Sequence, residues 1–199
     1  MAEGRTAWPK VADEWFVEAV SVTAWLLDLV RLSAPIIWDP ACGQGNVLRA
    51  AKNAGYSTIG SDIRERAGVR EVADQFDIRD FLAGRITRPS AGERRALVTN
   101  PPYGRGKLTE AFTRRALAMS FVDEVCVLVN AKFLWGQARA IGLWSEHPPD
   151  LIFPVNPRPS IPPGEYLLAG GKAEGGVESF AWLYWRVPAE RTGAARFVW

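Results

Sequence analysis

The chain has 199 residues, of which 48% are hydrophobic and 23% charged, and its formal net charge of +2 is too small to indicate a nucleic-acid partner by itself. This length is enough for one α/β domain with a sizeable core, and no apolar run is long enough to cross a bilayer. The first five residues lack the apolar core of a signal peptide, and the two cysteines and single histidine have no metal-ligand spacing, so we expect a cytoplasmic protein with no membrane contact and no metal site.

The first half of the chain alternates between apolar runs and amphipathic segments. Between positions 15 and 30 the apolar residues recur three to four apart, which predicts a helix. Short apolar runs indicate buried strands, and Gly55 is placed to end a helix in the left-handed conformation. In chain order we expect a helix within 8–31, a strand at 36–38, a tight loop at 39–46, a helix at 47–53, a strand at 56–63, a loop with a short helix at 64–76, a third strand and turn at 77–82, a basic loop at 84–95 and a strand at 96–100.

The second half begins regularly and then becomes rich in proline and glycine. Its expected elements are a helix at 108–119, a buried strand at 124–130, a strand at 151–155, a proline-rich loop at 156–164, a glycine-rich hairpin or excursion around 170–176 and a last strand at 177–187. An alternating order of strands and helices predicts a mostly parallel central sheet with helices on both faces. The fold class expected is therefore α/β, in a single Rossmann-like domain over 1–199.

The segment Asn100-Pro101-Pro102-Tyr103 stands out because it ends an apolar strand abruptly. Proline cannot extend the interior of a sheet, so the strand must stop at Asn100. In an open α/β sheet, ligands bind outside the carboxyl ends of the strands, where this corner would lie. The corner offers an amide, a backbone carbonyl and a flat ring. This set suits a planar base that carries an exocyclic amine.

Three earlier strand ends carry residues suited to a nucleoside-like ligand. Gly43 and Gly45 let the backbone approach a ligand at the start of a helix. Leu48 stands where a dinucleotide-binding loop needs a small residue, so the loop is a poor NAD site. Asp62, at the next strand end, could accept both hydroxyls of a ribose. Asp80-Phe81 follows as an acceptor beside a ring that could lie against adenine.

Together these motifs resemble the S-adenosylmethionine-dependent class I methyltransferases, specifically compact, phage-type DNA adenine-N6 methyltransferases. The motif order is similar to the gamma arrangement, and the segment beginning at Asp13 is similar to the family's N-terminal cofactor segment, although Glu18 stands where proline is common. The resemblance implies a cofactor segment and helix over 1–35 and a catalytic core over 36–199, without a separate target-recognition domain. It implies S-adenosyl-L-methionine as cofactor, held by Trp15, Asp39, Pro40, Ala41, Gly43, Gly45, Asp62, Ile63, Asp80, Phe81 and Asn100.

The resemblance also implies methyl transfer to the N6 amine of an adenine flipped out of double-stranded DNA. The catalytic residues would be Asn100, Pro101, Pro102 and Tyr103. The Asn100 oxygen and the Pro101 carbonyl would accept the amine hydrogens, Tyr103 would stack on the base, and Phe153 or Ile161 would cover its other face. DNA phosphates are expected at Arg88, Arg94, Arg95, Arg105, Lys107 and Arg158, the last within an Arg-Pro-Ser turn that the family shares. A homodimer would enlarge the DNA footprint.

Several alternatives stay open. Cytosine C5 methylation is disfavoured because neither Cys42 nor Cys126 follows an active-site proline. Cytosine N4 methylation uses related chemistry, usually with serine in place of Asn100. RNA adenine and protein glutamine methyltransferases share Asn-Pro-Pro-Tyr, although the glutamine enzymes usually carry an added N-terminal domain. A non-catalytic subunit that binds cofactor or DNA is the alternative from another class.

Overall fold

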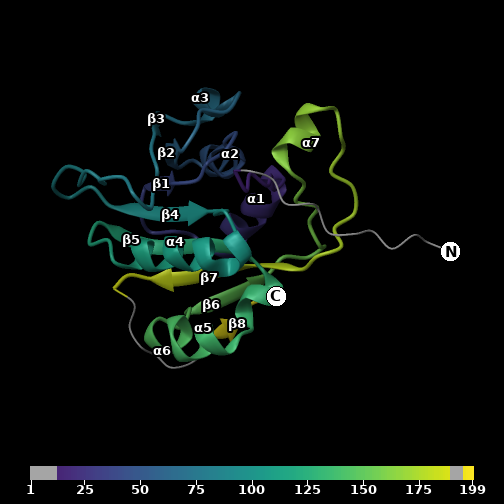
Figure 1. Cartoon of the computed structure of the whole chain (residues 1–199). Coiled ribbons are helices and arrows are strands. Elements are labelled where there is room, and N and C mark those ends of the chain that lie inside the picture. The colour runs from purple at the N-terminus through teal and green to yellow at the C-terminus, as the bar shows by residue number, and fades with distance from the viewer. Residues whose placement is uncertain (1–12, 189–194) are drawn as a thin grey trace.

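The computed structural model describes residues 13–188 and 195–199, which form an eight-stranded sheet with flanking helices (Figure 1). The strand order is β3-β2-β1-β4-β5-β7-β6-β8. The first five strands of this order pair in parallel, whereas β7 is antiparallel to both neighbours. The strands are β1 (Ile36–Asp39), β2 (Ser57–Asp62), β3 (Gln75–Ile78), β4 (Arg95–Thr99), β5 (Val122–Asn130), β6 (Leu151–Pro154), β7 (Phe180–Arg186) and β8 (Arg196–Phe197).

Helices cover both faces of the sheet, and alternating side chains along each strand supply both contacts. Ile37 of β1 belongs to one buried cluster, together with side chains of α1 and α2, whereas its neighbour Trp38 belongs to the other, together with α4 and α6. The helices are α1 (Val20–Leu29), α2 (Asn46–Asn53), α3 (Val69–Val72), α4 (Lys107–Leu117), α5 (Gln137–Ile141), α6 (Leu143–Glu146) and α7 (Gly164–Leu168), with 3-10 turns η1 (Gly104–Gly106) and η2 (Ala131–Leu134). The predicted α/β class and mostly parallel sheet are confirmed.

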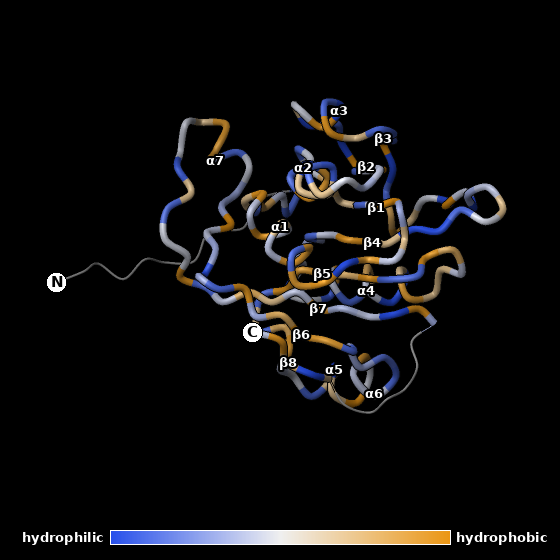
Figure 2. Tube along the Cα trace, turned by 180° about the vertical axis from the view of Figure 1, so that it is seen from behind, coloured by the Kyte–Doolittle hydropathy of each residue, from blue (hydrophilic) through white to orange (hydrophobic). Residues whose placement is uncertain are grey.

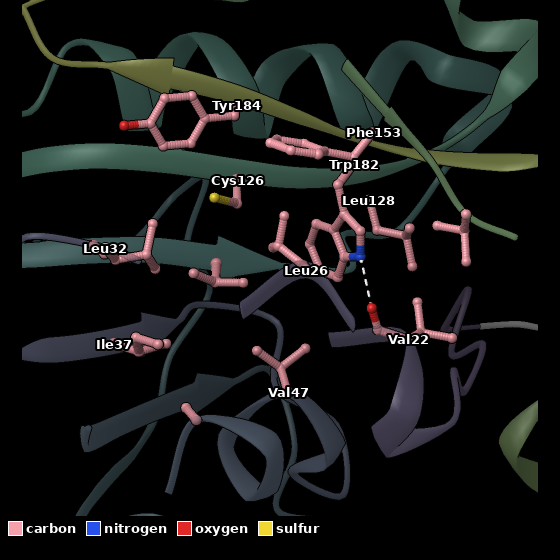
Figure 3. Close-up of a cluster of buried hydrophobic side chains, with 14 of the residues drawn as sticks. Val22, Leu26, Leu32, Ile37, Val47, Cys126, Leu128, Phe153, Trp182 and Tyr184 are labelled. Atoms are coloured by element: carbon pink, nitrogen blue, oxygen red, sulfur yellow. Dashed lines mark hydrogen bonds between the residues drawn. The ribbon is translucent and has the colours of Figure 1, made fainter. Parts of the chain in front are cut away.

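The cluster between the sheet and α1 is shown in Figure 3. Leu26 of α1 is fully buried there, and the indole Nε1 of Trp182 on β7 donates to the backbone carbonyl of Val22 at 3.1 Å. This bond satisfies the one polar atom of a large buried ring, as buried tryptophans generally require. Apolar colour follows the strands in Figure 2, and the 84–95 loop is largely hydrophilic.

The predicted elements differ from the structure mainly at their ends. The first helix begins at Val20 rather than near position 15, because residues 15–17 are extended and bonded to 162–164. The third strand ends at Ile78, so Asp80-Phe81 lies in the turn after it rather than at its end. The glycine-rich stretch is preceded by the short helix α7, and this helix was not expected. Also unpredicted are α5, α6 and β8.

Parts of the expected 8–31 segment and of the 1–35 unit lie outside the described residues, since description starts at position 13. Within 13–188 and 195–199, no helix has the length and apolar character needed to cross a membrane. The same residues include no group of three or more histidine, cysteine or acidic side chains placed to hold a metal ion.

Candidate active site

The site lies where the chain reverses direction across the sheet, between β1 and β4. From β1 the chain proceeds outward to β2 and β3, and it then returns to form β4 on the other side of β1. Such a switch point leaves a crevice at the carboxyl ends of the two central strands. Asp39 ends β1 and is buried, and its Oδ1 accepts from the Thr99 hydroxyl at 2.7 Å and from Ala41 N at 3.0 Å. These bonds fix the loop after β1 to the end of β4, and burial raises the pKa of Asp39 well above its usual range.

The loop after β1 depends on glycine at two points. Gly43 has φ +51°, and a Cβ there would lie 2.8 Å from the Trp15 Nε1. Gly45 has φ +91°, and its Cβ would lie 2.5 Å from a methyl group of Val72. Side chains are therefore excluded by both conformation and space. The Gly43 N–H donates to Asp62 Oδ2 at 2.8 Å, which connects the loop to the end of β2.

A cavity of about 290 Å³ opens beside this loop. It brings together all of the predicted cofactor residues except Gly45, which supports the loop from outside the cavity: Trp15, Asp39, Pro40, Ala41, Gly43, Asp62, Ile63, Asp80, Phe81 and Asn100. The Arg66 guanidinium lies 4.0 Å from the centroid of the Trp15 ring and forms an ion pair with Asp13 at 3.2 Å. These contacts hold an aromatic wall and a cation at the mouth of the cavity.

Two of these residues have roles beyond the lining of the cavity. Phe81 is almost fully buried, with its ring centroid 4.8 Å from that of Phe112, so most of its surface belongs to the core. Asp80 Oδ1 accepts from the backbone N–H groups of Leu82 and Ala83 and thereby stabilises its own turn. The other carboxylate oxygen of Asp80 is the one that a ligand could use.

The Asn100 amide is held by three hydrogen bonds. Its Nδ2 donates to Glu18 Oε2 at 2.7 Å and to the Phe16 carbonyl at 3.2 Å, and its Oδ1 accepts from the Tyr103 hydroxyl at 2.8 Å. A carbonyl has no proton to donate, so the nitrogen of the amide must face Phe16. Burial, followed by the charge of Glu18, raises the pKa of Tyr103 well above its usual range, so its hydroxyl stays a donor.

A larger cavity, of about 790 Å³, lies on the other side of this corner and shares Glu14 and Phe16 with the smaller one. Its aromatic part includes Tyr103, whose ring centroid is 5.8 Å from that of Phe16 and 6.3 Å from that of Phe180. Of the two residues suggested to cover the second face of the base, Ile161 lines this cavity. Phe153, the alternative, is buried in the core beneath α1 and lines neither cavity.

The four residues of the catalytic segment occupy different positions. Asn100 and Pro102 line the smaller cavity, and Tyr103 lines the larger one. Pro101 is buried and lines neither cavity. The segment therefore passes between the two cavities.

Charged residues around the larger cavity include several that the sequence did not single out. Arg105, predicted for DNA, lines it with φ +56°, a left-handed conformation that is uncommon for arginine. Lys107 and Arg158 are exposed at the same end of the sheet, since they follow β4 and β6 in the chain. Lys132 and Arg139 also line the cavity and were missed, although their position just after β5 could have indicated them.

Three of the predicted DNA-binding arginines lie at the opposite end of the sheet. Arg95 begins β4, so it and the preceding loop lie at the amino ends of the parallel strands. Figure 1 shows this loop and α7 at opposite ends of the sheet. Arg94 forms an ion pair with Asp123 at the start of β5, Arg95 Nε donates to Glu93 at 2.8 Å, and Arg88 donates to Ser120 at 3.0 Å. These three arginines therefore lie away from the two cavities, because the loop leads into β4 rather than out of it.

No protein-family model matches the chain, and no curated protein matches its sequence. Solved structures do match. A protein from Pyrococcus horikoshii assigned as an RNA methyltransferase has a TM-score of 0.58 at 14% identity, with 84% of each chain covered. A modification subunit assigned to a type I restriction enzyme of Vibrio vulnificus has a TM-score of 0.58 at 15% identity, with 90% of this chain and 45% of the subunit covered. The 23S rRNA methyltransferase ErmE has a TM-score of 0.54 at 14% identity, with 90% of this chain and 72% of that chain covered.

These likenesses, at such low identity, concern the fold. The chain has the Rossmann-like fold of methyltransferases, and it spans less than half the length of the modification subunit. A fold of this kind supports many substrates, so the substrate has to be argued from the site.

Proposed function

We propose that this protein is an S-adenosylmethionine-dependent methyltransferase that acts on the N6 amine of adenine in DNA. The observation that carries the proposal is the Asn100 amide, which is fixed at the corner between two adjoining cavities. A methyl donor and a methyl acceptor must meet at one point while each is bound on its own side. The two cavities provide that arrangement.

The smaller cavity fits the cofactor. Its loop needs glycine at position 43, where a Cβ would collide with Trp15, and this leaves backbone space beside the cavity. Asp62 accepts from Gly43 N and Arg64 N, and a carboxylate has enough lone pairs to accept ribose hydroxyls as well. Trp15 and Phe81 supply apolar surface for an adenine ring. When bound, S-adenosylmethionine would supply an electrophilic methyl group on a sulfonium.

The larger cavity suits a flat base at its corner with Tyr103. The lone pair of an aromatic amine is delocalised into the ring, so the amine is a weak nucleophile. Acceptance of both amine hydrogens, by Asn100 Oδ1 and the Pro101 carbonyl, favours a tetrahedral nitrogen whose lone pair can point at the methyl group. Positioning and electrostatics would carry most of this catalysis. Tyr103, Phe16 and Ile161 offer apolar surface to replace the stacking that an extruded base loses.

The cysteines support amine chemistry over cytosine C5 chemistry. Cys42 and Cys126 are both buried, and burial raises the pKa of each thiol. A C5 methyltransferase needs a cysteine nucleophile at the base, and neither cysteine lines the larger cavity. The exposed Arg105 at that cavity suits a polymer with phosphates, whereas Lys132 is paired with Glu178 and Arg139 donates to the Phe133 and Trp135 carbonyls.

The test is incubation of the protein with isotopically labelled S-adenosylmethionine and matched double-stranded DNA, single-stranded DNA and RNA, followed by mass spectrometry of the nucleosides. We expect N6-methyl-2′-deoxyadenosine from DNA. N4-methylcytosine, or N6-methyladenosine from RNA alone, would replace the substrate but keep the reaction class. Binding of the cofactor without methylation of any of these polymers would contradict the proposal.

A further inference from the structure

Glu18 connects the two halves of the site although it belongs to neither predicted motif. It lies in the extended segment before α1 and is 6% exposed. Its Oε2 accepts from Asn100 Nδ2 at 2.7 Å, and its backbone carbonyl accepts from Asn46 Nδ2 at 2.7 Å. Asn46 is the first residue of α2, which follows the cofactor loop. Asn46 thus fixes the backbone of Glu18, and the Glu18 carboxylate in turn holds the Asn100 amide.

We propose that Glu18 is a positioning residue: its carboxylate helps to keep the Asn100 oxygen turned toward the substrate amine, and its protonation weakens that hold. This proposal rests on the proposed function, in which Asn100 Oδ1 accepts an amine hydrogen. It assigns a role to a buried acid that lies outside the predicted cofactor and catalytic motifs.

The chemistry follows from what each form of Glu18 can donate. An ionised carboxylate only accepts, so it requires the NH₂ of Asn100 to face it. A protonated carboxyl can accept through one oxygen or donate its O–H to Oδ1, so it no longer requires the NH₂ to face it. Only the Phe16 carbonyl and the Tyr103 hydroxyl then oppose a turned amide. The turned amide would present N–H groups to the amine, which also carries N–H groups. In addition, the negative charge behind the amide favours the positive charge that develops on the amine during methyl transfer.

The surroundings of Glu18 determine when it changes form. Burial raises the pKa of Glu18 from 4.5 to about 7, and the hydrogen bond from Asn100 opposes part of that rise. The titratable groups that face Glu18 are Asp39 at the end of β1 and Tyr103 after β4. Burial is the largest cause of their raised pKa values, and the charge of Glu18 raises both pKa values further. Glu14, from the same segment, accepts from Gly104 N at 2.9 Å.

The first measurement is the pH dependence of the methylation rate on double-stranded DNA at saturating cofactor. The wild-type kcat should rise with pH through an apparent pKa near 7 and then level off, because ionised Glu18 holds the productive amide more firmly than protonated Glu18 does. Glu18→Gln keeps an acceptor without a titrating proton, so kcat should fall roughly tenfold at high pH and lose this acid limb, with little change in KM for the cofactor.

Glu124→Gln is a matched control, because Glu124 is also buried, at 3% exposure. It lies near the amino end of β5, away from the cavities, and accepts hydrogen bonds from Ser33 and Tyr184. This variant should keep the acid limb. An acid limb that persists unchanged in Glu18→Gln would assign it to another group, such as Asp39, and would overturn the proposal.

The second measurement does not depend on activity. The side-chain amide resonances of Asn100, followed by NMR in the wild-type protein between about pH 5.5 and 8.5, should titrate with an apparent pKa near 7. If they titrate while no polymer is methylated, the proposed function fails and the hold of Glu18 on Asn100 stands. If they do not move over this range, the proposal is wrong whatever the protein methylates. This titration remains decisive even if Glu18→Gln does not fold.

Discussion

Asn100 is the residue whose loss distinguishes an enzyme from a binding protein. Its side chain is half-buried at a strand end, and none of its three hydrogen bonds lies within the sheet. We expect Asn100→Ala to lower turnover by about 10²-fold or more, the scale for loss of one positioned group at a reacting centre. The measurement is the rate of methyl transfer from labelled cofactor.

Cofactor affinity and melting temperature should change much less in Asn100→Ala than turnover does. Asn53→Ala is a control, since Asn53 is exposed at the end of α2. Retention of normal methylation by Asn100→Ala would remove Asn100 from catalysis. Loss of the folded state would instead make it a structural residue of the strand end.

The raised pKa of Glu18 also predicts how stability varies with pH. The folded protein binds the Glu18 proton more tightly than the unfolded chain does, so this group favours folding most below pH 4.5, and the contribution is lost as pH rises toward about 7. The difference in unfolding free energy between wild type and Glu18→Gln should shift by about 3 kcal/mol against the wild type over that interval. Denaturant unfolding at a series of pH values measures it. A difference independent of pH would show that Glu18 is not a buried titrating acid.

Asp62 belongs to the cofactor cavity, where its carboxylate accepts from Gly43 N and Arg64 N. Asp62→Ala should weaken the binding of S-adenosylmethionine by about 1.5–3 kcal/mol, the range for hydrogen bonds to a charged group. Calorimetry on the folded variant gives the value. Asp77→Ala is a suitable control, because Asp77 is exposed and pairs with Arg79. Equal affinities for Asp62→Ala and wild type would exclude contact with the cofactor.

At the residue scale, sequence motifs predict the residues proposed to contact the ligand better than they predict the residues that position those side chains. Asn100, Asp62 and Gly43 could be placed because each follows a recognisable apolar strand. Glu18 could not be placed as a partner of Asn100, since 82 residues separate them and the contact exists only after folding. The sequence marked it only as an exception to a common pattern.

Among the elements, α1 is held to the sheet by one narrow apolar face. Leu26 is fully buried on that face, whereas Leu29 of the same helix is 40% exposed. Leu26→Ala should lower the unfolding free energy by about 2–5 kcal/mol, because it leaves a cavity against Trp182 and its neighbours. Leu29→Ala should cost far less. Denaturant unfolding of both variants tests this, and similar losses for the two would mean that α1 does not pack as described.

The elements that sequence could predict are those with a local signal. Strands β1, β4 and β5 contain short apolar runs, and α2 and α4 show helical periodicity, so these elements were placed to within a few residues. The start of α1 was wrong because residues 15–17 bond to 162–164, a contact that overrides their local pattern. The short helices α5 and α6 span only five and four residues, too few for a periodic signal.

At the scale of the whole molecule, the six basic residues predicted to contact DNA lie at two opposite ends of the sheet. Arg105, Lys107 and Arg158 lie at the carboxyl ends of the parallel strands, beside the cavities, and Arg88, Arg94 and Arg95 lie at the amino ends. If DNA binds over the cavities, replacement of the first three should reduce the slope of log affinity against log salt by roughly one for each cation that contacts a phosphate. Replacement of the second three should leave the slope unchanged.

The second triple variant is thus the matched control for the first, with the same number of charges removed. Because Arg94 and Arg95 form ion pairs, their loss is also expected to affect stability, so unfolding should be measured in parallel. A change of slope in the second variant alone would place the DNA at the amino ends of the strands, away from Asn100.

The position of β7 has a consequence for the order in which this protein can assemble during synthesis. It is the last long strand in the chain, yet it lies between β5 and β6. Until residues 180–186 have left the ribosome, β6 cannot join the sheet and β5 keeps an open apolar edge. The nascent chain therefore has to carry an unfinished sheet until β7 has been made, a state that invites mispairing or chaperone capture.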